Sequence, residues 1–175
     1  STLAEIPVGE VERLGNAHAF TYPPSLAQAV DALQGWENVT AFVEVKRASI
    51  RRFGREAVLR RIAEVLQPAL DRCVLISFDL PSIKILRLMT GARIGWVLSQ
   101  YDTEAQAQAA ELAPQFLFMN LERLPAEPEP LWSGPWDWAL YEVRDLATAT
   151  ACQQRGVRYV ETMAVRDLVD AFAAS

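Results

Sequence analysis

The segment AFVEVKRAS, residues 41–49, places the acid Glu44 and the base Lys46 two positions apart at the end of an apolar run. The run VTAFVEV, residues 39–45, has the length and composition of a β-strand. Side chains two positions apart in a strand point to the same side, so Glu44 and Lys46 share a face with Phe42. At the carboxyl end of a barrel strand, the inward face leads to the place where active sites lie. The alternative is an ion pair at the end of a strand without a chemical role.

Five further runs have the length and composition of strands: CVLISF (73–78), RIGWVL (93–98), QFLFMN (115–120), WALYEV (138–143) and VRYVET (157–162). Amphipathic helical patterns lie between most of them, at residues 53–70, 80–90, 102–113 and 146–155, with others at 23–36 and 165–174. Strand followed by helix, repeated, is typical of a parallel sheet with right-handed crossovers. The expected fold is therefore α/β, with about six parallel strands alternating with helices in a single domain, residues 1–175.

Residues at the expected helix ends support this alternation. Asp102 and Thr103 are placed to cap the helix after the third strand. Gly91 and Gly156 stand where helices end and strands begin, a position where glycine adopts a positive φ most easily. One segment, LERLPAEPEPLWSGPWD at residues 121–137, interrupts the pattern because its prolines forbid a long helix. Its tryptophans are expected to pin the segment to the core, and a binding surface on a loop is the alternative.

Composition excludes several classes of protein. The net charge of -5 and a pI near 5.0 argue against nucleic-acid binding, which needs clustered basic residues. The basic run from Lys46 to Arg61 is interrupted by apolar residues at helical spacing and fits the solvated side of a helix. Cys73 and Cys152 form no CxxC pattern and are expected to be buried thiols.

The expected location of the protein is the cytoplasm. No apolar stretch approaches the roughly 20 residues that span a bilayer, so we expect no transmembrane segment. The first residues, STLAEIPVGEVERL, do not read as a signal peptide, and a targeting segment upstream of them stays an open alternative.

The predicted sheet is either open and doubly wound or most of a (β/α)8 barrel, which usually needs about 250 residues. The chain has no GxGxxG, Walker or GxSxG pattern. The sequence therefore does not support dinucleotide binding, nucleoside-triphosphate binding or serine-hydrolase activity, which are common among α/β folds. A carboxylate such as Glu44 can hold a hard divalent cation, and an ammonium such as Lys46 can hold a phosphate.

Several segments, taken in order, resemble the bacterial glycerophosphodiester phosphodiesterases. FVEVK (42–46) resembles the family's IEIK, and LISF (75–78) resembles its SF strand. YEVRD (141–145) falls on the family's WTVND, and GVRYVETM (156–163) falls on GVDGIITD. Upstream, YPPSLAQAVDAL (22–33) is similar to the IPTLEEVL helix. The resemblance covers nearly the whole chain at compatible spacings.

This resemblance implies an incomplete TIM (β/α)8 barrel, the carboxyl-terminal portion of such an enzyme. It also implies metal-dependent hydrolysis of a small-molecule glycerophosphodiester to glycerol 3-phosphate and an alcohol. Glu44 matches the family's glutamate that binds Mg²⁺ or Ca²⁺. Lys46 matches the catalytic lysine that faces the phosphate, and Tyr141 takes the place of a tryptophan in the substrate pocket.

The chain also departs from the family. The HRG, PENT, ELD and HD segments, which by resemblance carry two catalytic histidines and most metal ligands, are missing. The sole histidine, His18, is not followed by Asp and is expected in a loop without a catalytic role. Arg144 replaces an asparagine and Met163 an aspartate. Because hard cations need several oxygen ligands and phosphodiester cleavage needs proton transfer, we expect this chain alone to be inactive.

Three functional hypotheses follow. The first is the carboxyl-terminal part of a genuine phosphodiesterase, with two strands and their motifs missing. The second is a noncatalytic binding or interaction module on a broken barrel, whose open sheet edges are covered by a partner or by a second copy in a homodimer. The third is an unrelated α/β enzyme that uses other residues, such as Asp79 or Glu142.

Overall fold

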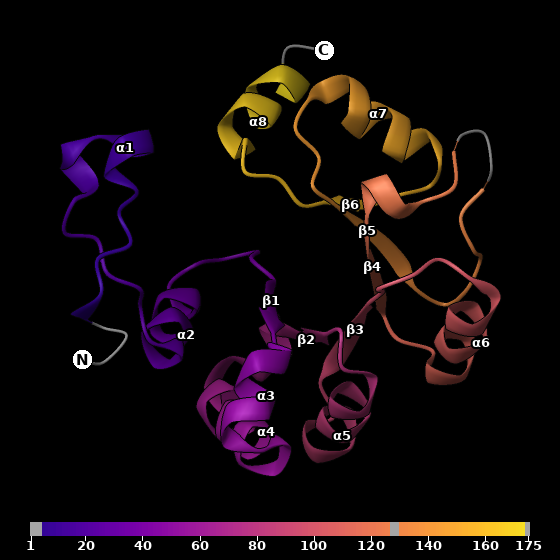
Figure 1. The fold of residues 1–175 in the computed structure, drawn as a ribbon, viewed down its shortest axis with the longest axis horizontal. Coiled ribbons are helices and arrows are strands. Elements are labelled where there is room, and N and C mark those ends of the chain that lie inside the picture. The colour runs from indigo at the N-terminus through magenta and orange to yellow at the C-terminus, as the bar shows by residue number, and fades with distance from the viewer. Residues whose placement is uncertain (1–4, 127–129, 174–175) are drawn as a thin grey trace.

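Six β-strands form one parallel sheet in the part of the chain that the structure, a computed structural model, describes: residues 5–126 and 130–173. They are β1 (Ala41–Glu44), β2 (Cys73–Ser77), β3 (Arg93–Val97), β4 (Phe116–Asn120), β5 (Asp137–Tyr141) and β6 (Tyr159–Val160). Each strand pairs in parallel with the next one along the chain. Figure 1 shows the sheet curling into part of a barrel, which confirms the expected fold.

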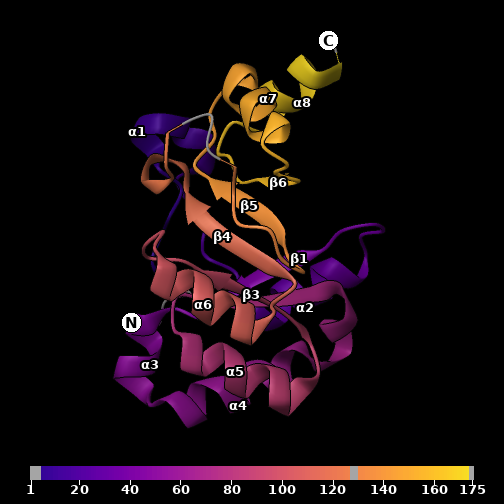
Figure 2. The same ribbon diagram turned by 90° about the vertical axis from the view of Figure 1, so that its right-hand side faces the viewer.

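Helices cover the outer face of the curled sheet, as Figures 1 and 2 show for α4 to α7. The α-helices are α1 (Val11–Leu14), α2 (Leu26–Gln34), α3 (Arg47–Phe53), α4 (Arg55–Leu66), α5 (Leu80–Thr90), α6 (Thr103–Leu112), α7 (Leu146–Gln154) and α8 (Val165–Ala173). Among the elements of the described residues, 3-10 turns lie at η2 (Asn16–His18), η3 (Gln67–Arg72) and η4 (Leu121–Arg123). The amino-terminal α1 and η2 lie to one side of the sheet (Figure 1).

Aspartate side chains cap the starts of α5, α6 and α7. The carboxylates of Asp79, Asp102 and Asp145 accept a hydrogen bond from the backbone N–H three residues on, at the starts of α5, α6 and α7. Such a cap is worth about 1 kcal/mol, because the first N–H groups of a helix have no partner within it. Gly91 and Gly156 adopt φ values of 68° and 85°, so the expected helix ends are confirmed.

The basic stretch from Lys46 to Arg61, which the sequence pattern assigns to one helix, lies on two. The helix predicted over residues 53–70 corresponds to α4 and η3, and α3 precedes it. Gly54, with a φ of 82°, separates α3 from α4 because this backbone conformation ends the first helix. Arginines of both helices, including Arg51 and Arg60, are exposed. The expectation of a solvated basic face is therefore confirmed.

The sheet separates two hydrophobic layers, because successive strand side chains point to opposite faces. On the outer face, buried residues pack beneath the helices, among them Leu75 with Leu59 and Leu117 with Ile83. The inner face carries a smaller cluster: Val74, Ile76, Val97, Phe116, Phe118 and Ala139. Phe42 of β1 packs edge-on against the Phe116 ring, with centroids 5.0 Å apart.

The proline-rich segment between β4 and β5 is held to the core by aromatic contacts. The rings of Tyr101 and Trp132 stack with centroids 4.0 Å apart, and the Trp132 backbone N–H donates to the Tyr101 hydroxyl at 3.1 Å. The Trp138 indole N–H donates to the Trp132 carbonyl oxygen at 3.1 Å, and Trp136 is buried. The tryptophans therefore pin the segment as expected, while Pro128 lies outside the described residues.

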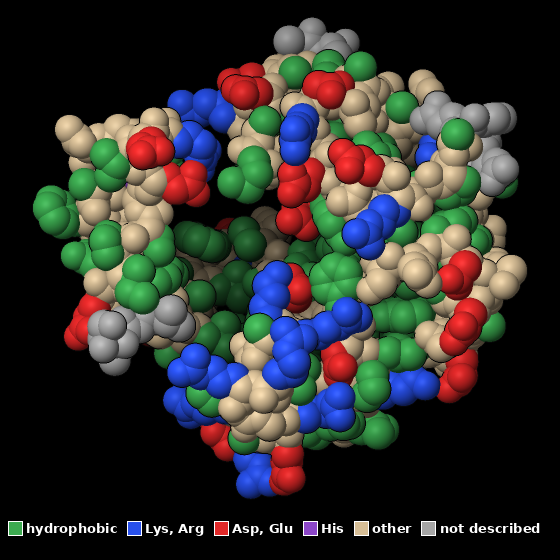
Figure 3. All heavy atoms as spheres, viewed as in Figure 1, with side chains coloured by type: hydrophobic (Ala, Val, Ile, Leu, Met, Phe, Trp, Pro, Cys, Tyr) green, Lys and Arg blue, Asp and Glu red, His purple; other side chains and the backbone are tan. Residues whose placement is uncertain are grey.

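The barrel is open between its first and last strands. Among the described residues, β1 pairs only with β2 and β6 only with β5. A closed barrel of this type has eight strands, so the opening corresponds to two strands and their helices. Figure 3 shows a hollow at this opening with hydrophobic side chains inside it.

Candidate functional site

Glu44 and Lys46 meet at the carboxyl end of the edge strand β1. Lys46 Nζ lies 2.5 Å from Glu44 Oε2, and the two form an ion pair. The Glu44 side chain is only 25% exposed, whereas that of Lys46 is 66% exposed. The sequence analysis expected the two to share a face, and the structure brings them together. The pair lies at the mouth of the barrel beside the opening.

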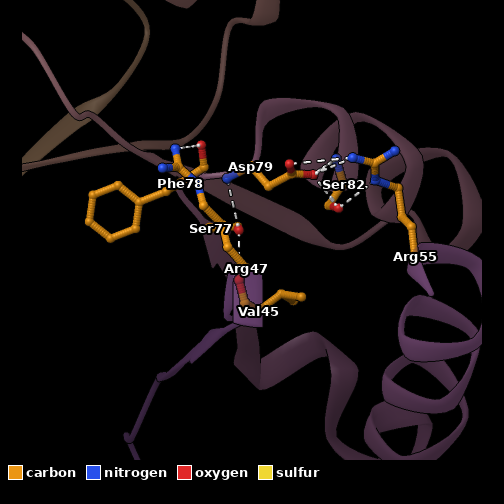
Figure 4. Close-up of polar contacts among 7 residues, drawn as sticks. All are labelled: Val45, Arg47, Arg55, Ser77, Phe78, Asp79 and Ser82. Atoms are coloured by element: carbon orange, nitrogen blue, oxygen red, sulfur yellow. Dashed lines mark hydrogen bonds and ion pairs between the residues drawn. The ribbon is translucent and has the colours of Figure 1, made fainter. Parts of the chain in front are cut away.

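A hydrogen-bond network fixes the backbone that carries this pair (Figure 4). The buried Ser77 hydroxyl, at the end of β2, donates to the Val45 carbonyl oxygen at 2.7 Å and accepts from the Asp79 N–H at 3.0 Å. Arg47 Nη2 donates to the Phe78 carbonyl oxygen at 2.8 Å, and its guanidinium lies over the Phe78 ring. Because a buried hydroxyl with both partners satisfied favours one geometry, the end of β1 is held against the end of β2.

Asp79 acts as a helix cap within the same network. Its carboxylate accepts from the Ser82 N–H at 3.1 Å and the Ser82 hydroxyl at 2.5 Å, and it pairs with Arg55 at 3.3 Å (Figure 4). Burial alone would raise the pKa of Asp79, but the hydrogen bonds from Ser82 and the Arg55 guanidinium outweigh it and hold the pKa below its usual value. These contacts give Asp79 a structural role: it caps α5 and connects that helix to Arg55 of α4.

Tyr141 ends β5 and packs against the inner hydrophobic cluster. Burial raises the pKa of its hydroxyl, Arg123 opposes the rise, and Glu161 and Glu44 add to it. The hydroxyl therefore stays protonated at neutral pH and is a hydrogen-bond donor. Charged groups at the ends of three elements, Glu44 of β1, Arg123 of η4 and Glu161 just after β6, thus act on the residue that the family resemblance assigns to the substrate pocket.

A hollow of about 610 Å³ lies on the inner face between β1 and β6. Phe42 and Glu44 line it from β1, and Tyr159 and Glu161 line it from β6. Glu161 was not among the residues that the sequence analysis selected. Its signal was present, because Tyr159 and Glu161 repeat the aromatic-then-acid spacing of Phe42 and Glu44. Two carboxylates therefore face the hollow from opposite sides of the opening.

Two arginines converge on the end of β3. Arg47 Nη2 lies 3.4 Å from the Ser99 hydroxyl oxygen, and Arg123 Nη1 donates to the Ser99 carbonyl oxygen at 2.9 Å. From the sequence, Arg47 is predicted only as part of a solvated basic run, and no pattern points to Arg123. No local pattern joins the two residues, because they come from the ends of different strands.

The residues of the described chain do not by themselves fit a divalent cation. Among residues 5–126 and 130–173, no group of three or more His, Cys, Asp or Glu side chains is close enough to hold a metal ion. Mg²⁺ and Ca²⁺ require about six or more oxygen ligands, several of them from carboxylates or carbonyls. Glu44 by itself therefore offers too few ligands for either ion.

The remaining residues named from the sequence lie away from this mouth or in ordinary structural roles. His18 is exposed in η2. Glu142 is exposed and pairs with Arg144 at 3.2 Å. Cys73 and Cys152 are buried, as expected. In the described ranges, every helix is too short or too polar to cross a membrane.

Several solved structures with a similar fold are described as phosphodiesterases. A protein assigned as a glycerophosphodiester phosphodiesterase from Galdieria sulphuraria matches 99% of this chain and 72% of its own, with a TM-score of 0.72 at 14% identity. A glycerophosphodiester phosphodiesterase from Parabacteroides distasonis matches 86% and 64%, with a TM-score of 0.70 at 16% identity. This chain shares their fold. A phosphodiesterase from Oleispira antarctica, in complex with the product sn-glycerol-3-phosphate, matches 91% and 65%, with a TM-score of 0.73 at 15% identity.

The chain is shorter than these proteins. It spans between 63% and 72% of the lengths of the matched structures. No family model matches the sequence, and no curated protein is found to be similar. The likeness at this level of identity is a likeness of fold, and it agrees with the family resemblance of the sequence segments.

Proposed function

We propose that this chain is the carboxyl-terminal part of a phosphodiester hydrolase that cleaves glycerophosphodiesters to glycerol 3-phosphate and an alcohol. The observation that carries the proposal is the meeting of Glu44, Lys46 and Tyr141 at the mouth of a half-barrel with the fold of glycerophosphodiester phosphodiesterases. Three residues matched to the family by sequence thus lie at the carboxyl ends of strands, where barrel enzymes carry their chemistry.

Each of the three residues has a role in this proposal. Glu44 contributes one carboxylate to a Mg²⁺ or Ca²⁺ site, and the bound metal would offset the charge of the phosphate. Lys46 supplies a flexible, exposed ammonium that contacts the phosphate. Tyr141 forms one wall of the pocket and presents a protonated hydroxyl as a donor.

We propose further that the chain alone does not hydrolyse these substrates. Cleavage of a phosphodiester requires a proton for the leaving oxygen, and the sole histidine, His18, is exposed in η2. The test is hydrolysis of glycerophosphocholine and of an aryl phosphodiester with Mg²⁺ or Ca²⁺, beside a Glu44→Ala control. We expect no rate above that control, and a rate abolished by Glu44→Ala would contradict the statement.

A chimaera tests the activity itself. The strands that carry the family's histidines are taken from the Parabacteroides enzyme and placed before residue 5, and the folded product is assayed with glycerophosphocholine. We expect metal-dependent hydrolysis that falls about a hundredfold or more with Glu44→Ala. Arg61→Ala, which removes an exposed arginine paired with Glu64 on α4, serves as the matched control and leaves the rate unchanged. A folded chimaera without hydrolysis would overturn the proposed function.

A second candidate function is that of a noncatalytic interaction module. Tyr159, Val165 and Val169 are exposed around the hollow, and the edges of β1 and β6 leave backbone groups available for pairing. In this case we propose that a second copy of the chain covers the opening, since twofold homodimers are the commonest assemblies.

The oligomeric state separates the two candidates. If the chain is an interaction module, light scattering should find a dimer. The substitution Val169→Asp, beside the hollow, should then convert that dimer to a monomer. Leu88→Asp is the matched control, because Leu88 is also exposed but lies on α5 on the outer side. A monomer at high concentration would reject the second candidate.

A further inference from the structure

We propose that Arg47 and Arg123 form a phosphate-binding pair at the mouth of the barrel, distinct from the Glu44–Lys46 pair. The choice of a glycerol phosphate ester as ligand rests on the proposed function. The presence of an anion site rests on the geometry of the two guanidinium groups.

The two arginines come from separate strand ends and reach the same residue. Arg47 follows β1 and crosses the end of β2 to reach the Ser99 hydroxyl, at 3.4 Å. Arg123 follows β4 and reaches back to the Ser99 carbonyl oxygen, at 2.9 Å. Ser99 itself follows β3. Two positive charges are thus brought together although they are 76 positions apart in the chain.

Neither charge is neutralised by a carboxylate in the part of the chain that the structure describes. Other basic side chains at this mouth have acidic partners: Lys46 pairs with Glu44, and Arg144 pairs with Glu142. Arg47 and Arg123 instead donate to neutral acceptors, the hydroxyl and carbonyl oxygens of Ser99 and Phe78. Two like charges held close together without a counter-charge repel one another, and an anion between them removes that repulsion.

The contacts that hold the arginines also leave donors for a ligand. A guanidinium has five N–H donors in a planar fork, and each arginine uses only one terminal nitrogen in these bonds. Arg47 is further oriented by its position 5.2 Å from the centroid of the Phe78 ring. Side chains oriented in advance lose less freedom on binding, and paired forks match the oxygen spacing of a phosphate.

The neighbouring charges define which anion fits. Tyr141 lies within the electrostatic reach of Arg123 and offers a hydroxyl donor on the inner side. Glu161 and Glu44 also act on Tyr141, so the inner side of the mouth carries negative charge. Asp102 and Glu104 line a separate hollow beside Arg47 without forming an ion pair with it among the described residues. A phosphate monoester, with nearly two negative charges, gains more from a paired arginine site than a singly charged diester does. We infer that the pair favours the monoester.

The test is a titration of the whole chain, followed by backbone amide NMR shifts, at low ionic strength. The probes are inorganic phosphate, glycerol 3-phosphate and glycerophosphocholine. We expect saturable binding of the first two in the millimolar range, with weaker binding of the diester. Arg47→Ala and Arg123→Ala should each weaken binding by about tenfold or more, since each removes a charge-assisted hydrogen bond. Arg144→Ala, whose charge is already paired, should change the affinity by less than about twofold.

Charge-conserving variants keep the test decisive if an alanine variant folds poorly. Arg47→Lys and Arg123→Lys retain the charge but lose the planar fork, so we expect affinities between those of wild type and the alanine variants. No saturable binding by the wild type, or equal losses in the Arg144 control, would overturn the proposal. The proposed function fails separately, in the chimaera: a folded chimaera that binds glycerol 3-phosphate through Arg47 and Arg123 without hydrolysing glycerophosphocholine would overturn the proposed function and leave the phosphate-binding pair intact.

Discussion

The covered side of the half-barrel and its open side differ in how their side chains are enclosed. Along β2 to β5, each strand lies between two others, and residues such as Leu75 and Leu117 are fully buried beneath the helices. Along β1, β6 and α8, one sheet edge is free, and Val165 and Val169 are 59% and 61% exposed. Parallel strands are normally buried on both faces. The covered side therefore holds most of the buried apolar core, whereas the open side leaves apolar side chains and strand edges exposed.

The open side also holds the candidate chemistry. Glu44 and Lys46 stand on one edge of the opening and Glu161 on the other, whereas Ser77 and Asp79 tie the end of β1 to the covered side. A site on an edge strand is supported by hydrogen bonds to a neighbouring strand on one side only. Substitutions on the two sides should therefore differ in their effects on stability.

The largest expected difference comes from truncating matched aliphatic residues. Leu117→Ala removes a side chain that is 0% exposed in the centre of β4 and should lower the free energy of unfolding by about 2–5 kcal/mol. Val169→Ala, on the open side, should lower it by less than about 0.5 kcal/mol. Urea unfolding measures both. Similar losses of unfolding free energy at the two positions would contradict this difference between the sides, because Val169 of α8 would then have to be buried in solution.

An added methyl group gives the next largest effect. A Cβ at Gly95 in β3 would lie 2.9 Å from Ile76 Cγ2 and 3.1 Å from the Phe116 Cβ, so Gly95→Ala should cost about 1–3 kcal/mol. Val165→Ile adds a methyl group beside the hollow and should change stability by less than about 0.5 kcal/mol. Thermal unfolding of the two variants compares a filled interior with an open one. An unchanged unfolding midpoint for Gly95→Ala would mean that the side chains around Gly95 are packed loosely enough to accept a methyl group.

The smallest expected effect lies at the seam between the two sides. Asp79→Ala removes the cap of α5 and should cost about 1 kcal/mol at neutral pH, whereas Asp79→Asn keeps an acceptor and should cost less. The pKa of Asp79 is lower in the folded chain than its usual value, so its stabilising charge is present at neutral pH and is lost as the pH falls below about 4.

Unfolding measured from neutral to acid pH checks the sign of this effect. The wild type should lose more stability than Asp79→Asn as the carboxylate becomes protonated. Parallel profiles for the two proteins would show that the negative charge of Asp79, through its bonds from Ser82 and its pair with Arg55, adds nothing to stability. A neutral acceptor at the start of α5 would then be sufficient for the cap.

Much of the fold was predictable because its signals are local. The apolar run at residues 41–45 and the caps at Asp102 and Asp145 lie within a few residues of what they determine. The division of the basic stretch at Gly54 was missed because helical spacing continues through it in the sequence. A glycine with positive φ ends a helix without changing the hydrophobic pattern around it.

The candidate site was predictable only in part. The spacing of Glu44 and Lys46 placed them on one face, and the ion pair between them agrees with it. Glu161 and Arg123 were missed because their importance depends on neighbours from other strands. Sequence patterns describe a residue's own element and carry no distances between elements.

By itself, the sequence determined the alternation of strands and helices, the parallel connectivity, and the face on which Glu44 lies. These follow from side-chain periodicity and backbone preferences, which act over a few residues. Only the tertiary structure decided that Arg47 and Arg123 meet at Ser99, and that Glu161 faces Glu44 across a hollow. The physical reason is the curl of the sheet, which brings the ends of separate strands to one mouth and leaves the first and last strands unpaired.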